Sequence, residues 1–370
     1  MFSDFYAGRR VLVTGHTGFK GGWLSLWLNQ LGASVHGLSL EPPTSPNLHD
    51  VIREKAFASE SHCDVCDLNA LQSAMAHINP EVIFHLAAQS LVRLSYEQPI
   101  ETFRVNTLGV ANLLEATRRL EGPWTILVIT SDKCYQERRW PYGYRENDTL
   151  GGHDLYSISK AAAELVVEGW RKSCFQTHPK LGRLATARAG NVIGGGDYAR
   201  DRLVPDCVRA LLENRPIPVR NPSAVRPWQH VLDCLSGYLW LAAQLARGPK
   251  DSPLASGFNF GPLPGAGLPV AAVVDEMLRC WPGRWEAAPQ PDAPHEAPSL
   301  NLAIDKAANL LGWSGVWGLR EAVSETVGWY RARHLDKVSA MVSFTEDQIA
   351  RYQQAAQRKG AVWTRNESKA

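Results

Sequence analysis

The sequence lacks any apolar run that approaches the ~20 residues needed for a membrane-spanning helix. It also lacks a strong charge of either sign, because 39 Lys and Arg residues face 37 Asp and Glu residues and leave a net charge of +2. This balance gives no reason to expect nucleic acid or a membrane as a partner. The first ten residues have no apolar core typical of a secretory signal, so we expect a cytoplasmic protein.

Cysteine does not follow the spacing of a metal or disulfide framework. There are seven cysteines, an odd number, and Cys63 and Cys66 form a C-x-x-C pair with no second pair at zinc-ribbon spacing. The pattern favours reduced, partly buried thiols, and we expect no metal site. Tryptophan is frequent, at 13 residues, and we interpret most of these side chains as packing residues.

The first half of the chain alternates between strand and helix patterns. Short apolar runs predict strands at 10–14, 34–38, 81–86, 125–129 and 184–189. Helical spacing of apolar residues predicts helices at 23–31, 100–118 and 161–170. Such alternation is typical of an α/β fold in which a parallel, doubly wound sheet is covered by helices on both faces.

The pattern changes after Asn191, where loops rich in Gly, Pro and Arg appear. Helical spacing recurs at 204–213, 231–246, 270–280 and 319–333, whereas prolines exclude a long helix in the irregular stretch 282–298. These features predict a smaller, mostly helical C-terminal domain for the substrate. We expect the cofactor domain to span 1–190 plus about 229–260, the substrate domain 191–228 plus about 261–335, and a polar C-terminal tail, with a possible terminal helix, 336–370.

A glycine-rich turn joins the first predicted strand to the first helix. Gly15, Gly18 and Gly21 form a G-x-x-G-x-x-G pattern, in which they would permit a tight turn, close approach of a pyrophosphate and close helix–strand packing, respectively. The helix N-terminus would offer free amides to phosphates. A turn without a ligand is the alternative, but this placement in the first βα unit favours a Rossmann-type dinucleotide site.

The end of the second strand bears on the choice of cofactor. An acidic residue there usually binds the ribose 2′-hydroxyl of NAD, but this strand ends with Ser39, and Glu41 is less well placed. No Lys or Arg follows before Arg53 to balance a 2′-phosphate, so we expect NAD, loosely bound, rather than NADP. Asp64 and Val65 either face the adenine or, in the case of Asp64, cap the next turn; both interpretations stay open.

Two segments carry groups suited to acid–base chemistry. Tyr156 and Lys160 are four residues apart, which places them on one face of a helix, and a nearby Lys⁺ would lower the pKa of the phenol. The strand 125–129 ends in Ser131, Asp132 and Lys133, at the edge where ligands bind in such sheets. Taken alone, each segment is better explained as a solvated surface helix or turn, but the Gly15–Gly21 pattern upstream favours the catalytic interpretation of Tyr156 and Lys160.

Together these segments resemble the extended short-chain dehydrogenase/reductase family over nearly the whole chain. Further elements of the resemblance are His85-Leu-Ala-Ala-Gln89, Asn106 with the residues after it, and Arg188-Ala-Gly-Asn-Val-Ile193. The stretches 16–23, 130–135, 191–197 and 201–206 resemble the nucleotide-sugar 4,6-dehydratases of this family that act on CDP-glucose. Lys133 is their specific mark, since the dTDP-sugar enzymes have Thr-Asp-Glu at 131–133.

The resemblance implies an NAD-dependent dehydration of CDP-glucose to CDP-4-keto-6-deoxyglucose, a reaction of deoxysugar synthesis. Tyr156, oriented by Lys160 and Ser131, would deprotonate the C4 hydroxyl while hydride passes to NAD⁺. Lys133 would then remove the C5 proton, Asp132 would protonate the departing C6 hydroxyl, and hydride would return to C6.

The resemblance also implies binding residues and a homodimer or homotetramer. The implied cofactor contacts, besides Tyr156 and Lys160, are Gly15, Thr17, Gly18, Phe19, Lys20, Gly21, Asp64, Val65, Leu86, Ala87 and Ala88. The implied substrate contacts are Ser90, Asn191, Arg202, Leu203, Arg220 and Arg226. For Arg202 and Arg220 a solvated loop arginine is the usual alternative. The alternatives are an epimerase or reductase on the same fold, and a catalytically silent NAD-sensing protein.

Overall fold

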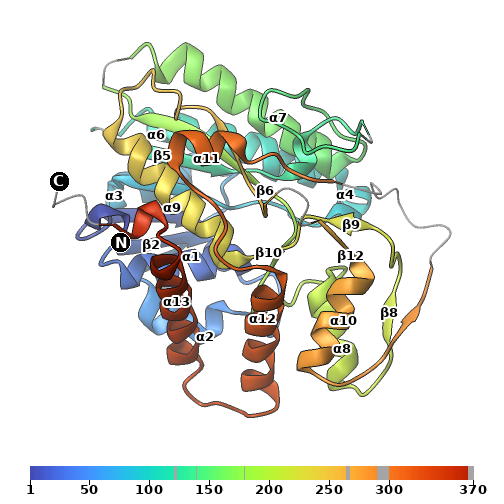
Figure 1. Ribbon diagram of the computed structural model, residues 1–370. Coiled ribbons are helices and arrows are strands. Elements are labelled where there is room, and N and C mark those ends of the chain that lie inside the picture. The colour runs from blue at the N-terminus through green and yellow to red at the C-terminus, as the bar shows by residue number, and fades with distance from the viewer. Residues whose placement is uncertain are drawn as a thin grey trace.

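The computed structural model describes all residues except 121, 123, 139, 179, 264–266, 290–299 and 366–370. A seven-stranded parallel sheet lies at its centre, in the order β11-β6-β5-β4-β1-β2-β3 (Figure 1). The strands are β1 Arg10–Thr14, β2 Ser34–Ser39, β3 Ser59–His62, β4 Val82–His85, β5 Thr125–Ile129, β6 Arg183–Ala189 and β11 Gly257–Phe260. The order reverses between β1 and β4, which opens a crevice at the carboxyl ends of these strands.

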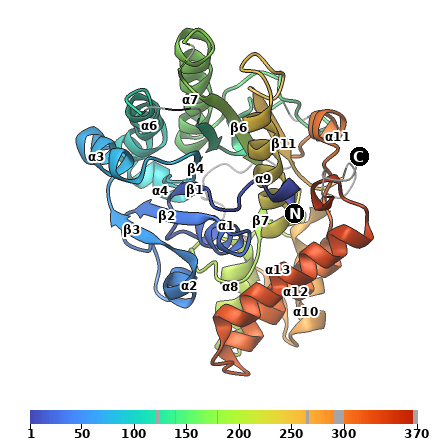
Figure 2. The same cartoon turned by 90° about the vertical axis from the view of Figure 1, so that its left-hand side faces the viewer.

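Helices cover both faces of the sheet, as the alternating pattern predicts (Figure 2). One face carries α3 Leu68–Ile78, α6 Gly109–Thr117 and α7 Leu155–Trp170, which bury a core around Leu12, Ile83 and Ile126. The other face carries α1 Phe19–Gln30 and α9 Val231–Arg247. The sequence prediction of a doubly wound α/β sheet is therefore confirmed.

Most predicted elements are found within a few residues of their expected bounds, but the long helix at 100–118 is interrupted. The segment consists of α5 Pro99–Phe103, a π-helical turn Arg104–Leu108 and α6. Within the π turn, Asn106 is buried and bonds both Gln89 and Ser159. Such π turns often occur at functional sites, where the extra residue redirects a side chain.

Seven further α-helices lie in the described part of the chain. They are α2 His49–Ala56, α4 Val92–Glu97, α8 Leu203–Leu212, α10 Val270–Cys280, α11 Asp305–Leu311, α12 Leu319–His334 and α13 Met341–Arg358, with short helical turns at Phe2–Asp4, Asp132–Cys134, Arg171–Phe175 and Val362–Thr364. Three short strand pairs join β7 Val192–Ile193 to β10 Gln229–His230, β9 Val225–Arg226 to β12 Leu268–Pro269, and β8 Ile217–Val219 to β13 Trp285–Ala287. The predicted irregular stretch 282–298 thus contains one short strand, and its part from 290 onward lies outside the described residues. The predicted division into domains stays a prediction.

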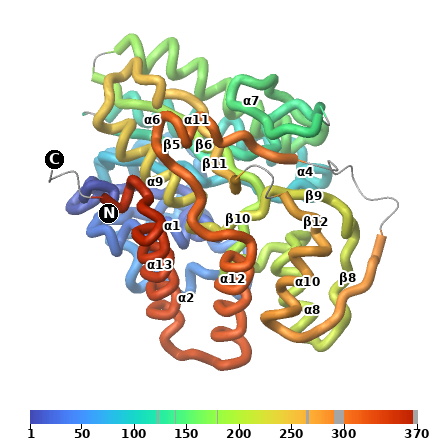
Figure 3. Tube along the Cα trace, in the orientation of Figure 1, coloured from blue at the N-terminus to red at the C-terminus, as the bar shows by residue number. Residues whose placement is uncertain are grey.

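The C-terminal segment contains a terminal helix, as the sequence pattern suggested, but this helix is amphipathic and not polar throughout. Helix α13 buries Ile349 and Tyr352, and Tyr352 packs edge-on against Trp27 of α1. Near the two chain ends, Phe2 stacks on Trp363 with 4.9 Å between ring centroids. The turn Phe2–Asp4 lies beside the turn Val362–Thr364 that follows α13 (Figure 3). The last helix is therefore part of the core on the α1 face.

Among the described residues, no helix is both long enough and apolar enough to cross a membrane. All seven cysteines are free, and Cys63, Cys134, Cys207 and Cys234 are buried.

Candidate active site

The glycine loop between β1 and α1 lies at the crevice, and two of its glycines are required by the geometry. Gly15 has a φ of +71°, and a Cβ there would lie 2.6 Å from the amide nitrogen of Ala87. A Cβ on Gly21 would collide with the carbonyl oxygen of Gly15. These contacts confirm the predicted tight turn and the close packing of helix on strand.

Gly18 has a different environment, which leaves its backbone open to a ligand. It precedes α1 with an ordinary φ of −79° and accepts the first described helical bond, from Gly22 N at 2.8 Å. The amides of the first helical turn have no intrahelical acceptor and form an anion site together with the helix dipole. This loop fits a dinucleotide pyrophosphate.

The side chain of His16 connects the glycine loop to neighbouring elements. Its Nε2 lies 3.0 Å from Oε1 of Glu60, an oxygen that also bonds His49 of α2. A Cβ on Gly37 would overlap the His16 ring. Because the Glu60 carboxylate bridges the two imidazoles, the group ties the loop to β3 and α2.

The residues at the end of β2 leave room for a ribose hydroxyl. Thr17 Oγ1 donates to the Leu40 carbonyl at 3.1 Å, so the 2.8 Å contact with Ser39 is donated by Ser39 and leaves its lone pairs able to accept. Glu41 is 85% exposed and faces His62 instead. This arrangement agrees with the expectation of NAD held without a strong acidic contact.

The turn after β3 is held by Asp64. Its carboxylate accepts from the Cys66 amide at 2.9 Å and from Arg104 at 3.0 Å. The Val65 side chain is buried in the core beneath Gly109. The turn-capping interpretation of Asp64 is confirmed, and its contact with adenine stays a prediction.

The loop after β5 presents the Ser-Asp-Lys triplet. Ser131 caps the short helical turn Asp132–Cys134 by accepting from the Lys133 amide at 3.2 Å, and its hydroxyl donates to Asp132 at 3.0 Å. Asp132 is buried, and a Cβ on Gly190 would lie 3.1 Å from its Oδ2. Burial raises the pKa of Asp132, although the charge of Lys133 opposes this. A neutral carboxyl, able to donate a proton, is therefore favoured here.

Helix α7 places Tyr156 beside this loop. Asp154 caps the helix through the Ser157 amide at 2.8 Å, so the helix begins six residues earlier than the apolar pattern indicated. Tyr156 and Ser131 share a side-chain hydrogen bond. The structure thus brings together the two segments that the sequence offered separately.

We expected Lys160 to lower the pKa of Tyr156, but in the structure this pKa is raised, so the prediction is wrong. Burial raises the pKa of Tyr156 to about 12, and the groups that oppose this are Ser131, through its hydrogen bond, and Arg202, through its charge. Burial and repulsion from Lys20 lower the pKa of Lys160 to about 8. A lysine that is itself desolvated supplies less positive charge than a solvated one.

Lys20, predicted as a cofactor contact, lies among the catalytic candidates. Burial lowers its pKa, and the charges that act on it include those of Arg202, Asp132 and Asp197. The charge of Lys20 in turn lowers the pKa of Lys160. His85 is a further buried group near Lys160. Burial and the charge of Lys160 lower the pKa of His85 to about 3, and its Nδ1 lies 2.7 Å from Thr14 Oγ1.

The predicted substrate residues fall into two groups. Arg202 donates to Ser90 at 3.0 Å and to Asp197 at 2.9 Å, and its charge reaches Tyr156. Arg226 is buried, and its charge acts on Asp132. These residues border the catalytic groups.

The other substrate candidates lie farther out or contribute through the backbone. Arg220 donates to Asp201 at 2.7 Å in an exposed pair. Asn191 lies between β6 and β7 and accepts from the Gln229 amide through its carbonyl at 3.1 Å. Leu203 begins α8.

The predicted cofactor residues Leu86, Ala87 and Ala88 form a backbone loop that follows β4. This loop lies beside the glycine loop, where Leu86 N donates to Thr14 O at 3.1 Å.

Sequence reasoning missed one buried carboxylate behind the site. Glu164 is buried on α7 and pairs with Arg188 of β6 at 2.8 Å. Thr130 donates to the same carboxylate. Glu164 stands four residues after Lys160, so the spacing that joins Tyr156 to Lys160 could have identified it.

A glycine loop at the crevice of a doubly wound sheet, with a Tyr–Lys pair beside it, defines an enzyme of the short-chain dehydrogenase/reductase type that uses a dinucleotide. The chain belongs to the NAD dependent epimerase/dehydratase family, whose model matches residues 11–255. The family's description confirms the prediction of NAD as cofactor.

Three similar proteins locate the chain within this family. It is 45% identical over 334 residues to CDP-glucose 4,6-dehydratase of Salmonella typhimurium, covering 89% of this chain and 92% of that one. It is 25% identical over 279 residues to UDP-glucose 4-epimerase of Mycoplasma pneumoniae, covering 72% and 81%. The solved structure of TunA, an NAD-dependent NDP-hexosamine 5,6-dehydratase, matches with a TM-score of 0.73 at 25% identity, covering 89% and 99%.

Proposed function

We propose that this protein is an NAD-dependent nucleotide-sugar 4,6-dehydratase that converts CDP-glucose to CDP-4-keto-6-deoxyglucose. One observation carries the proposal: Tyr156 bonds Ser131, and Ser131 is followed directly by a buried Asp132 and by Lys133. Oxidation at C4 needs one acid–base group, and loss of water across C5 and C6 needs two more. The similarity to CDP-glucose 4,6-dehydratase supports this reading of the triplet.

The first chemical step belongs to Tyr156. As the phenolate, its oxygen takes the proton of the C4 hydroxyl and becomes a phenol, and Ser131 stabilises the phenolate by donating its hydroxyl proton to it in place of Asp132. Lys160 contributes positive charge from the same helix face. Bound NAD would accept hydride from C4 and return it to C6.

The second step belongs to Asp132 and Lys133. A ketone at C4 acidifies the C5 proton, which the Lys133 amine removes. Asp132, whose pKa is raised by burial, gives its proton to the departing C6 hydroxyl. The pair therefore divides base and acid roles between two adjacent side chains.

The cofactor site is proposed from the same geometry. The loop Gly15–Gly21 with Thr17, Phe19 and Lys20 would hold the pyrophosphate, and Ser39 would accept from the ribose. Asp64 and Val65 would border the adenine, and Leu86, Ala87 and Ala88 would line the path to the nicotinamide. The segment from Ser39 to Ile52 contains no Lys or Arg to balance a 2′-phosphate.

The nucleotide is proposed to lie between Ser90 and the arginines that follow β7. Arg202 and Arg226 border the catalytic groups and suit the diphosphate, since guanidinium groups bind phosphate oxygens in a bidentate manner. Asn191, Leu203 and Arg220 would complete the outer part of the site. Reaction is proposed to occur in the cytoplasm, and the product class is a precursor of deoxysugars, such as those of lipopolysaccharide O-antigen.

A homodimer is proposed through the outer surface of α5 and α7. Ile100 of α5 is 80% exposed and Leu165 of α7 is 61% exposed, and Leu108 of the π turn and Ile158 of α7 are exposed too, on segments that pack against each other. An apolar surface of this kind is typical of an interface. Light scattering of the wild type and of Leu165→Glu tests this arrangement, because the variant should dissociate.

The decisive experiment supplies the protein with NAD and, separately, with CDP-, dTDP-, UDP- and GDP-glucose. We expect a 4-keto-6-deoxy product from CDP-glucose, identified by mass and by NMR. A change of configuration at C4 without loss of water would establish an epimerase instead. Absence of any turnover with a folded, NAD-binding protein would favour a catalytically silent NAD sensor.

A further inference from the structure

A buried ion pair lies directly behind the catalytic loop. Glu164 and Arg188 are each about 4% exposed. Arg188 Nε donates to Glu164 Oε1 at 2.8 Å, and Arg188 Nη2 donates to Oε2 at 2.8 Å. Two threonine hydroxyls complete the carboxylate: Thr130 donates to Oε1, and Thr186 donates to Oε2 at 2.7 Å. The carboxylate therefore accepts four bonds from three residues, two of them on β6 and one in the loop after β5.

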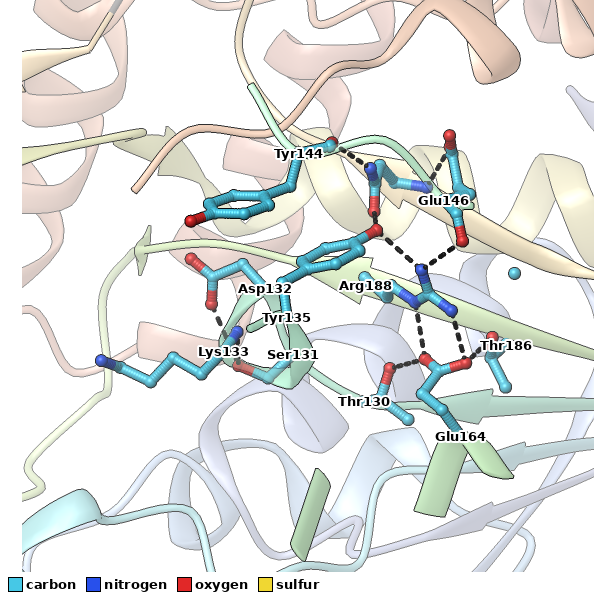
Figure 4. A network of polar contacts seen from close by, with 12 residues as sticks. Thr130, Ser131, Asp132, Lys133, Tyr135, Tyr144, Glu146, Glu164, Thr186 and Arg188 are labelled. Atoms are coloured by element: carbon cyan, nitrogen blue, oxygen red, sulfur yellow. Dashed lines mark hydrogen bonds and ion pairs between the residues drawn. The ribbon is translucent and has the colours of Figure 1, made fainter. Parts of the chain in front are cut away.

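The same pair also reaches the far end of the catalytic loop. Arg188 Nη1 donates to the Tyr135 hydroxyl at 2.7 Å, and that hydroxyl donates to Asn259 of β11 at 2.7 Å. Thr130 precedes Ser131, and Tyr135 follows the helical turn that contains Asp132 and Lys133. Figure 4 shows Arg188 between Tyr135 and Glu164, with the Lys133 side chain extending away from the pair. Both ends of the loop are thus bound by one ion pair.

Helix α7 supplies the other half of this relationship. Tyr156, Lys160 and Glu164 follow one another at intervals of four, on one helix face. The helix that bears the C4 base therefore also bears the carboxylate that fixes the loop with the C5 base. A shift of Glu164 would move the two sets of groups relative to each other.

The pair is satisfied in full, but this does not make it necessary for stability. Buried ion pairs are often replaceable by packed apolar residues at little cost, because desolvation offsets their attraction. Burial alone would raise the pKa of Glu164, yet the charge and hydrogen bonds of Arg188 and the threonine hydroxyls outweigh this and lower it. The charged form is therefore kept, and a rigid, directional network results.

We propose that Glu164 and Arg188 are positioning residues, which hold Ser131, Asp132 and Lys133 at a fixed place relative to Tyr156 and Lys160. The proposal rests on the proposed dehydration, because the ion pair would fix the groups that eliminate water relative to the groups that oxidise C4. Loosening the loop should slow elimination more than oxidation, since Asp132 and Lys133 lie inside the loop whereas Tyr156 lies on α7.

Two isosteric variants separate positioning from stability. Thr130→Val and Thr186→Val each remove one hydroxyl that donates to Glu164, but only Thr130 belongs to the catalytic loop. We expect Thr130→Val to lower the rate of product formation roughly 10-fold to 100-fold, the range for small misplacement of catalytic groups, with little change in KM. Enzyme-bound NADH should accumulate during turnover of CDP-glucose. Thr186→Val should match it in loss of thermal stability and keep normal turnover.

Hydrogen exchange gives a reading that does not depend on activity. The amides of Lys133 and Cys134, which bond Ser131, should exchange faster in Thr130→Val and at the normal rate in Thr186→Val. If both variants show the same exchange and the same turnover, the pair is merely structural and the proposal is wrong. If exchange separates the variants but wild type forms no 4-keto product, the positioning stands and the proposed dehydration fails.

Discussion

The phenol of Tyr156 shares a hydrogen bond with the hydroxyl of Ser131, which joins helix α7 to the loop at the carboxyl end of β5. When the phenol loses its proton, the Ser131 hydroxyl can stabilise the phenolate by donating to it in place of Asp132, at a site where burial raises the pKa of Tyr156 to about 12. Ser131 thus helps to lower the pKa of Tyr156, an effect that the sequence spacing assigned to Lys160 alone. This relationship links the oxidation step to the loop that performs elimination.

Tyr156→Phe removes the ionisable oxygen and keeps the ring. Oxidation at C4 should slow roughly 10²-fold to 10⁴-fold, the usual effect of losing an acid–base group, while substrate affinity changes little. Single-turnover formation of NADH measures the step. Tyr142→Phe, at a tyrosine that is 55% exposed, is the matched control. Near-normal turnover of Tyr156→Phe would remove this residue from the mechanism.

Gly18→Val tests the pyrophosphate site without straining the fold. The φ of Gly18 is −79°, and a Cβ there meets only the Gly15 carbonyl oxygen, at 3.3 Å. The variant should therefore fold, whereas its isopropyl group should occupy the space of the phosphates and abolish NAD binding. Calorimetric titration measures this. Gly328→Val is the control, since a Cβ on Gly328 meets nothing within 4 Å.

The same titration tests the choice of nicotinamide. We expect the wild type to bind NAD more tightly than NADP, because Ser39 and Thr17 offer hydroxyls but no cation. Tighter binding of NADP would overturn the interpretation of this loop.

Asp233 should make stability depend on pH. It is buried on α9, accepts from Val316 N and from the Tyr352 hydroxyl, and burial raises its pKa to about 6. Because the folded pKa exceeds the unfolded one, Asp233 contributes stability below about pH 4 that is lost as the pH rises through 6. The loss is on the order of 2–3 kcal/mol.

Thermal unfolding of Asp233→Asn between pH 4 and pH 7 measures this contribution. The amide keeps the acceptor oxygen and cannot ionise, so the variant should gain stability relative to wild type as the pH rises. Asp336→Asn, at an exposed aspartate, should follow the wild type. A constant difference between Asp233→Asn and wild type across this range would contradict the shift.

Local patterns predicted the elements whose side chains face a core. The apolar run Thr125–Ile129 is strand β5, and the helical spacing of Val270–Cys280 is helix α10, with the same bounds. Strand β3, Ser59–His62, has no apolar residue and exists because the edge of β2 accepts it, which no local pattern can show. The buried face of α13 depends in the same way on Trp27.

Only the site residues that are related by their spacing along the chain could be predicted from the sequence. The four-residue interval placed Tyr156 and Lys160 on one face, but their burial, which dominates both pKa values, depends on the whole fold. Arg188 was visible as part of a motif, yet its partner Glu164 is 24 residues away on a different element. Contacts of this kind arise from the sheet order and not from the local sequence.

Lys133→Met separates the two half-reactions. The variant keeps a flexible apolar stem but no amine, so Tyr156 and Ser131 should still oxidise C4 while C5 keeps its proton. In a single turnover with CDP-glucose, bound NADH should build up with a 4-keto-hexose that retains its C6 hydroxyl. Solvent deuterium should fail to enter C5. Lys172→Met, at a lysine whose side chain is 69% exposed, is the control and should turn over normally.

The neighbouring carboxyl gives a complementary outcome. Asp132→Asn keeps the shape but cannot donate to the C6 hydroxyl, so it too should stall after oxidation, yet with Lys133 intact it should still exchange the C5 proton with solvent. The two variants therefore differ in deuterium at C5 and agree in their accumulated NADH. If Lys133→Met eliminates water at the normal rate, Lys133 is not the base. The C5 proton must then leave to a water molecule or to another group that faces Asp132, of which Lys20 is the first to test, because its charge acts on that carboxyl.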